Sequence, residues 1–167
     1  MRAFVLVSVF LLAVPAATCD DGSIGYLPDG PIESIRMVRR VCSDDNLYVH
    51  HDGTFEDGVC WDASGCEPPY DGAFGEAFDL GPGVIECVSL WLTQIGGYQG
   101  QSTDVYVWEG GVAEEPGDVL EVVTGIVLED IPIWPEAGRY DVEIPASVPG
   151  GFTVGSWGNW PGQSGNP

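Results

Sequence analysis

The chain has 167 residues, of which 26 are Asp or Glu and five are basic, so its formal net charge at pH 7 is −21. Such a surface repels phosphate backbones and anionic headgroups, which excludes nucleic acid and acidic membranes as partners. With 24 Gly, 13 Pro and 44% hydrophobic residues, the chain is neither a helix bundle nor a disordered acidic tail. Its length suits one domain.

The first 18 residues have the layout of a secretory signal peptide. Arg2 supplies a positive start, and residues 3–14 form an apolar run that is too short to span a ~30 Å hydrocarbon core comfortably. We expect cleavage after Ala16 or close to it, because Val14 and Ala16 fit the −3 and −1 positions of the cleavage site. The sequence therefore predicts a secreted protein with no membrane insertion once the signal is removed.

A lipoprotein is the weaker alternative, because Cys19 directly follows the small residues of the cleavage site. Lipidation favours a branched apolar residue three positions before the cysteine and Gly, Ala or Ser immediately before it. Ala16 and Thr18 occupy these places and match poorly. Attachment to the cell surface through Cys19 stays an alternative to release.

Residues 19–42 are expected to be a linker or leader that contains a short helix or an edge strand. Residues 20–31 are acidic, rich in Gly and Pro, and show no period. Apolar residues then recur every third position over residues 32–41, with Arg36, Arg39 and Arg40 between them. Arginines that pair with nearby acids explain this stretch better than a functional basic patch.

Residues 43–167 are predicted to form a β-sandwich module. The predicted strands are residues 47–51, 73–80, 84–94, 104–109, 119–128 (two strands or one bent strand), 140–144 and 152–156. Seven to nine short strands that alternate between turn signals, without helical crossovers, indicate an all-β, jelly-roll-like antiparallel β-sandwich. The chain ends soon after the last predicted strand, so we expect it to be truncated or to be the first part of a longer protein.

The alternation within two strands predicts which side chains share a face. Over residues 84–94, Val84 shares a face with the two leucines at positions 90 and 92, and Ile85 lies on the opposite face. In the strand at residues 104–109 the two valines face one way and the aromatic side chains the other. Trp91 and Trp108 lie inside strands and are expected to pack in the core or between strands.

The cysteines indicate disulfides, because an exported protein meets an oxidising compartment. With Cys19 set aside, four cysteines remain and allow three pairings. Cys60 and Cys66 flank a short Gly-containing loop that can close locally, which leaves Cys42 and Cys87 for a long-range bridge. Sequence alone leaves the connectivity open.

Two metal sites are alternatives to these interpretations. Asp52, Glu56 and Asp57 supply the clustered oxygen ligands that Ca²⁺ prefers, but they fit no EF-hand loop, and ordinary turn residues explain them better. A calcium-stabilised structural domain therefore stays an alternative, and no other cofactor is expected. A zinc site that combines His50 and His51 with Cys60 and Cys66 is weaker, because the spacing matches no zinc-finger pattern.

Aromatic side chains near turns are the candidate ligand-binding residues. Trp157 and Trp160 lie in a segment rich in Gly and Pro, and Trp134 and Tyr98 also adjoin turns. Exposed indoles present large apolar faces to the C–H side of a sugar ring, so an extracellular polysaccharide is the most concrete ligand. The competing interpretation is that these rings pack half-buried at the ends of the sandwich.

No catalytic residue is predicted. The sequence has no Gly-x-Ser-x-Gly elbow and no Lys for a phosphate-binding loop. Because 26 acids make chance carboxylate pairs unavoidable, a secreted hydrolase with a glycosidase-type pair is only an alternative. The leading hypothesis is a non-catalytic module with an accessory, adhesive or ligand-binding role.

Several segments together resemble an uncharacterised module of secreted bacterial proteins. The matching strings are HHDGTFEDG at 50–58, PPYDGAFGE at 68–76, DVYVWE at 104–109, PGDVL at 116–120 and VGSWGNWPG at 154–162. The resemblance covers roughly residues 45–163 and implies a jelly-roll-like sandwich within a large surface or secreted protein. Other domains of that protein are then expected partners. The family implies no catalytic residues, and the chain lacks the sorting domain that such proteins carry.

Overall fold

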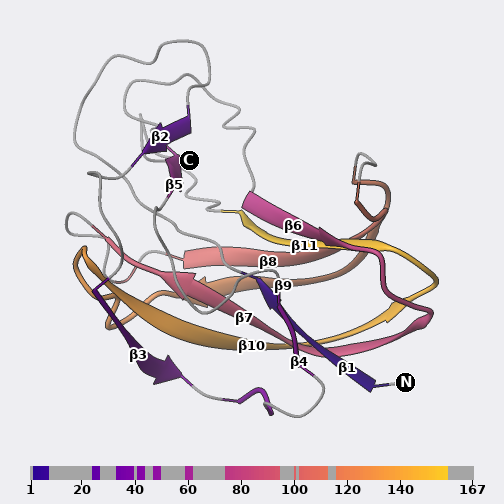
Figure 1. Cartoon of the computed structure of the whole chain (residues 1–167), viewed down its shortest axis with the longest axis horizontal. Helices are drawn as coiled ribbons and strands as arrows, with labels where there is room; N and C mark the ends of the chain where they lie inside the picture. The colour runs from indigo at the N-terminus through magenta and orange to yellow at the C-terminus, as the bar shows by residue number, and fades with distance from the viewer. Residues whose placement is uncertain are drawn as a thin grey trace.

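The computed structural model describes residues 2–7, 24–26, 33–39, 41–43, 47–49, 59–61, 74–94, 100, 102–112 and 116–157. The sandwich has seven strands in two packed sheets, three in the first and four in the second, and two further strands extend the first sheet to five (Figure 1). The described residues contain no helix. The predicted all-β sandwich is confirmed.

The first sheet is mixed rather than wholly antiparallel. Its strands lie in the order β3 (Ser34–Arg39), β10 (Glu136–Val148) and β7 (Gly83–Leu92). β7 is antiparallel to β10, whereas β3 runs parallel to it. The leader segment therefore contributes an edge strand to the sheet, which decides between the strand and the helix expected there.

Two further strands extend this sheet beyond β7. β1 (Arg2–Val7) pairs with β7 in parallel, and β4 (Leu47–Tyr48) pairs in parallel with β1. β1 falls inside the predicted signal segment. Cleavage near Ala16 would remove it and would leave the three-stranded sheet with β7 at its edge.

The second sheet is antiparallel throughout. Its strands lie in the order β6 (Phe74–Phe78), β11 (Phe152–Trp157), β8 (Ser102–Glu109) and β9 (Val119–Val127). β9 is one bent strand with Gly125 at a φ of 69°. A small separate sheet pairs β2 (Ile24–Tyr26) with β5 (Val59–Trp61).

Apolar side chains between the two sheets form the core. Its fully enclosed members come from both layers, and Phe78 stacks on Phe152 with ring centroids 5.4 Å apart. The predicted alternation of β8 holds, since Val105 and Val107 are completely buried. Burial of such side chains contributes about 1.5–3 kcal/mol each, which makes this layer the main source of stability.

A β-bulge corrects the predicted faces of β7. The register between β7 and β10 shifts between Glu143 and Ala146, so the inward face changes over within β7. As a result Ile85 is fully buried and Val84 is exposed, the reverse of the predicted faces at the start of this strand. The same bulge lets β10 run through Pro145, well beyond the predicted residues 140–144.

Gly138 allows β3 to lie close against β10. A Cβ atom at this position would approach Cγ2 of Val38 to 2.6 Å. Val38 in turn packs against the core, although most of β3 is exposed. Tertiary contact with β10 therefore outweighs the helix-like spacing of this stretch.

Candidate functional site

Most of the predicted site residues lie outside the described part of the chain. These are Trp160, Tyr98, Asp52, Glu56, Asp57, Cys66, His50, His51, Cys19 and Arg40. Trp134 is half-buried just before β10, and its backbone N–H donates to the carbonyl of Gln94 at 2.9 Å. Trp157 is the last residue of β11, with its Cα paired with that of Asp104.

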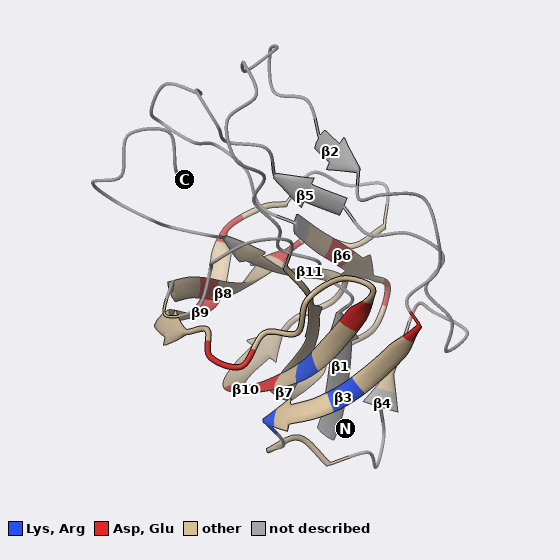
Figure 2. Ribbon diagram, turned by 90° about the vertical axis from the view of Figure 1, so that its left-hand side faces the viewer, with Lys and Arg blue, Asp and Glu red and all other residues tan. Residues whose placement is uncertain are grey.

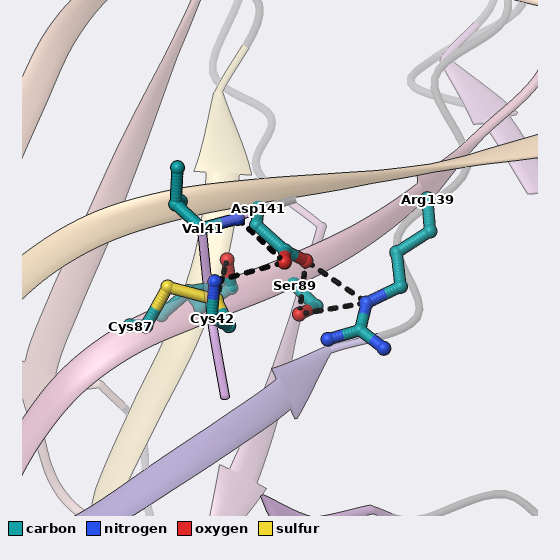
Figure 3. Close-up of polar contacts among 7 residues, drawn as sticks. Val41, Cys42, Cys87, Ser89, Arg139 and Asp141 are labelled. Carbon is teal, nitrogen blue, oxygen red and sulfur yellow. Dashed lines mark hydrogen bonds and ion pairs between the residues drawn. A yellow bond between two sulfur atoms is a disulfide. The ribbon is translucent and has the colours of Figure 1, made fainter. Parts of the chain in front are cut away.

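The predicted long-range disulfide is present between Cys42 and Cys87, with the Cα atoms 5.5 Å apart. Because Cys87 belongs to β7, this bond holds residues 41–43, hereafter the strap, against the outer face of the first sheet (Figure 3). The Cys60–Cys66 bridge falls outside the described residues.

Asp141 of β10 holds the strap through hydrogen bonds to its backbone. Its Oδ2 accepts hydrogen bonds from the backbone N–H groups of Val41 and Cys42 at 3.1 and 3.0 Å. Its Oδ1 accepts from the Ser89 hydroxyl at 2.6 Å and from Nε of Arg139 at 2.9 Å. All of these donors converge on one carboxylate (Figure 3).

The hydrogen bonds of this cluster tie the strap to β10 and β7. A carboxylate has about four acceptor positions, and four donors occupy those of Asp141. The carboxylate is completely buried, and its Arg139 partner also lies 5.8 Å from the Trp91 ring centroid in a cation–π contact. Trp91 is buried, as predicted. No local sequence pattern marks this cluster, because its members are up to 100 residues apart.

A pocket of about 280 Å³ opens on the side of the sandwich where β3 and β9 form the two sheet edges. Figure 2 shows this side, with the arginines of β3 in blue and the acidic turn after β9 in red. The lining residues come from β3, from the end of β9 with the turn that follows, and from β10. They are Val38, Arg39, Ile126, Val127, Glu129, Asp130, Tyr140, Asp141 and Val142.

The turn between β9 and β10 is fixed by two contacts to its backbone. Nη2 of Arg36 donates to the carbonyl of Asp130 at 2.8 Å, and the Tyr140 hydroxyl donates to the carbonyl of Glu129. Burial raises the pKa of Tyr140, the nearby carboxylate of Asp130 adds to the increase, and Arg36 opposes it. The pocket therefore has a defined wall that carries two exposed carboxylates.

A stacked aromatic pair lies on the outer face of the second sheet. The rings of Tyr106 and Trp108 are 5.0 Å apart between centroids and are inclined by only 10°. Both side chains are half-buried, since the alternating valines of β8 take the core positions. Trp108 is therefore a surface-facing residue that packs on its own strand, a placement that its position inside a strand did not reveal.

Within the part of the chain that the structure describes, no three His, Cys, Asp or Glu residues are grouped to hold a metal ion. That same part contains no helix that could cross a membrane. No family model, curated protein or solved structure matches the chain.

Proposed function

We propose that the chain is an exported, non-catalytic β-sandwich module, of the jelly-roll type, that binds carbohydrate as part of a larger surface or secreted protein. The observation that carries this proposal is the half-exposed stack of Tyr106 on Trp108. Paired aromatic rings on a flat sheet face offer an apolar surface to the C–H side of a sugar, and the adjacent hydroxyl and indole N–H supply polar contacts.

Small residues flank the pair and leave it open on the β11 side. Across the ladder Tyr106 faces Gly155, and Gly155 faces Gly75 of β6. Trp108 faces Thr153 in the same way. A Cβ atom at Gly75 would lie 3.0 Å from the carbonyl oxygen of Val154, so the backbones pack tightly here and no side chain rises from this position. The cross-strand neighbours of the aromatic pair on the β11 side are therefore small residues that do not rise above the rings.

Two features support the non-catalytic and exported parts of the proposal. The buried carboxylate of Asp141 is fully engaged by its four donors and positions the strap instead of a substrate. The Cys42–Cys87 disulfide is consistent with an oxidising extracellular compartment. The predicted signal segment supplies the route to that compartment.

The test is titration of the folded protein with a panel of soluble polysaccharides, followed by indole fluorescence and by a glycan array. For the polysaccharide that binds, we expect Trp108→Ala to weaken affinity by about tenfold or more, or roughly 1.4 kcal/mol. Tyr106→Phe keeps the stacked ring and should retain most of the affinity. Trp134→Ala tests the other half-buried candidate, in the turn before β10. Ile133→Ala is the control, because it removes an exposed apolar side chain next to Trp134 that belongs to no candidate site.

The proposal fails if no glycan binds, or if a glycan binds equally well to the wild type and to Trp108→Ala. Loss of binding in Trp134→Ala alone would place the site at the turn before β10. The melting temperature of each variant must stay close to that of the wild type for the comparison to hold.

A further inference from the structure

We infer that the pocket between β3 and β9 binds a small zwitterion with an apolar body, of the class of a free α-amino acid with a branched aliphatic side chain. This inference goes beyond carbohydrate binding. It rests on a different face of the molecule and on none of the aromatic residues. Its basis is a pocket whose lining combines a cationic side chain, two exposed carboxylates and several apolar side chains.

The two charged walls come from different sheets. Arg39 ends β3 in the first sheet, whereas Glu129 and Asp130 follow β9 of the second. All three side chains are exposed at the pocket. Among the described residues no ion pair involves any of them, although the pair between Arg139 and Asp141 is formed nearby. The charges on these walls are therefore available to a ligand.

Much of the remaining lining is apolar. Val38 and Ile126 also pack against the core, and Val127 is 55% exposed, an unusually open position for a large aliphatic side chain. A branched aliphatic group would cover Val127 and remove both surfaces from water, at about 25 cal/mol per Å² of apolar area. The volume of about 280 Å³ lies just below the range of roughly 300–1,000 Å³ that drug-sized ligands need, so a smaller molecule fits.

Charge decides between a zwitterion and a simple ion. A small anion would meet two carboxylates and the repulsion of a chain with a net charge of −21. A simple cation would be repelled by the positive charge of Arg39. A zwitterion places its carboxylate at Arg39 and its ammonium at Glu129 and Asp130, and each contact is a charge-assisted hydrogen bond.

The pocket is held in shape before any ligand arrives. Arg36 and Tyr140 fix the carbonyls of Asp130 and Glu129, so the turn that carries both carboxylates needs no ordering on binding. Such preorganisation lowers the entropic cost of association. The carboxylates themselves are not used in these contacts, which involve backbone oxygens only.

The experiment is isothermal titration of the folded chain with L-leucine, with two analogues that each lack one charge. We expect saturable binding of one leucine per chain, and at least tenfold weaker binding of 4-methylpentanoate, which lacks the ammonium, and of 3-methylbutylamine, which lacks the carboxylate. Because salt screens contacts between exposed charges, the affinity for leucine should fall as salt is added.

Variants locate the site. Arg39→Gln and the double variant Glu129→Gln/Asp130→Asn should each weaken leucine binding at least tenfold. Asn also suits the φ of 56° at position 130, so the turn should keep its shape. Glu143→Gln is the matched control, because it removes one exposed carboxylate from β10 outside the pocket and should leave the affinity unchanged.

Four results would overturn the inference. They are no saturation up to about 10 mM leucine, equal binding of the amine, equal binding of the carboxylate, and unchanged leucine binding in Arg39→Gln. None of these results bears on the carbohydrate proposal, since the Tyr106–Trp108 pair is untouched by these variants.

Discussion

The carboxylate of Asp141 accepts hydrogen bonds from two backbone amides, one hydroxyl and one guanidinium. In Asp141→Asn the side chain keeps one oxygen but presents an NH₂ group to donors, and Arg139 is left buried without its ionic partner. Breaking a buried ion pair from one side typically costs about 3–5 kcal/mol. We therefore expect the variant to lose about 3 kcal/mol or more of unfolding free energy, measured by urea denaturation.

Glu143→Gln provides the control for this experiment, since Glu143 lies on the same strand and is exposed. Surface substitutions of this kind usually change stability by less than about 0.5 kcal/mol. A loss of less than 1 kcal/mol in Asp141→Asn, roughly the value of one ordinary hydrogen bond, would show that the cluster does not anchor the strap.

Tyr140 gives the folded protein a dependence on alkaline pH. Burial raises the pKa of its hydroxyl above the usual value, with a further increase from Asp130. The folded chain therefore keeps a proton that the unfolded chain releases above about pH 10. The stability contributed by the neutral hydroxyl is complete below that pH and is lost as the pH rises through the folded-state pKa.

Replacing Tyr140 by Phe separates this effect from the hydrogen bond to Glu129. At neutral pH we expect the variant to lose about 1 kcal/mol, the value of the lost hydrogen bond. Above about pH 10 the stability of the wild type should fall more steeply than that of the variant. Urea midpoints between about pH 8 and about pH 12 give this comparison, and parallel curves would contradict the assignment.

At the scale of elements, the strap depends on the disulfide as well as on Asp141. Cys42 and Cys87 are separated by 45 positions in the sequence, and closing a loop of this length lowers the entropy of the unfolded chain by an amount worth about 4 kcal/mol. The double variant Cys42→Ala/Cys87→Ala should therefore unfold at a clearly lower urea concentration than the wild type. Ser147→Ala on β10, also exposed, serves as the control.

Equal stability of the double variant and the wild type would mean that the hydrogen bonds to Asp141 hold the strap without the covalent link. A loss well below about 4 kcal/mol, but above that of the control, would instead measure how much structure the unfolded chain retains around Cys42.

Local alternation predicted most of these strands, but it did not predict their partners. The valines of β8 alternate without interruption, and this strand was predicted with its faces correct. In β7 the bulge exchanges the faces near Ile85, because a bulge depends on the neighbouring strand. The sequence left helix and strand open for β3 for the same reason. Its strand conformation depends on β10, where the absence of a side chain at Gly138 leaves room for Val38.

The candidate sites were harder still to predict, because they depend on which strands become neighbours. The donors to Asp141 and the walls of the pocket come from strands far apart in the sequence, and no local motif joins them. The disulfide was an exception, because only a few cysteines were available and pairing restricts them to few choices. Sequence reasoning also passed over Tyr106 and Trp108 as ligand-binding residues, since a ring inside a strand can face either layer.

At the scale of the whole molecule, β1 lies inside the predicted signal segment. Removing this segment therefore tests both the predicted export and the contribution of β1 to the fold. β7 pairs with β1 at five positions but with β10 at nine, and β10 also joins β3. The fully buried core side chains that the structure describes come from the seven-stranded sandwich and its connecting segments, and Tyr48 of β4 packs against them only partly buried. Removing residues 1–16 should therefore leave two packed sheets that unfold cooperatively.

We expect the exported protein, analysed by intact mass, to begin near residue 17, and a variant made without residues 1–16 to show the same β-type circular dichroism as the full chain. Loss of β1 leaves β7 with unpaired backbone groups, so this form should self-associate more readily as its concentration rises, because an open edge strand is a template for pairing. If the shortened chain instead fails to fold while the full chain folds, β1 is a structural strand of the mature protein, and cleavage near Ala16 is wrong.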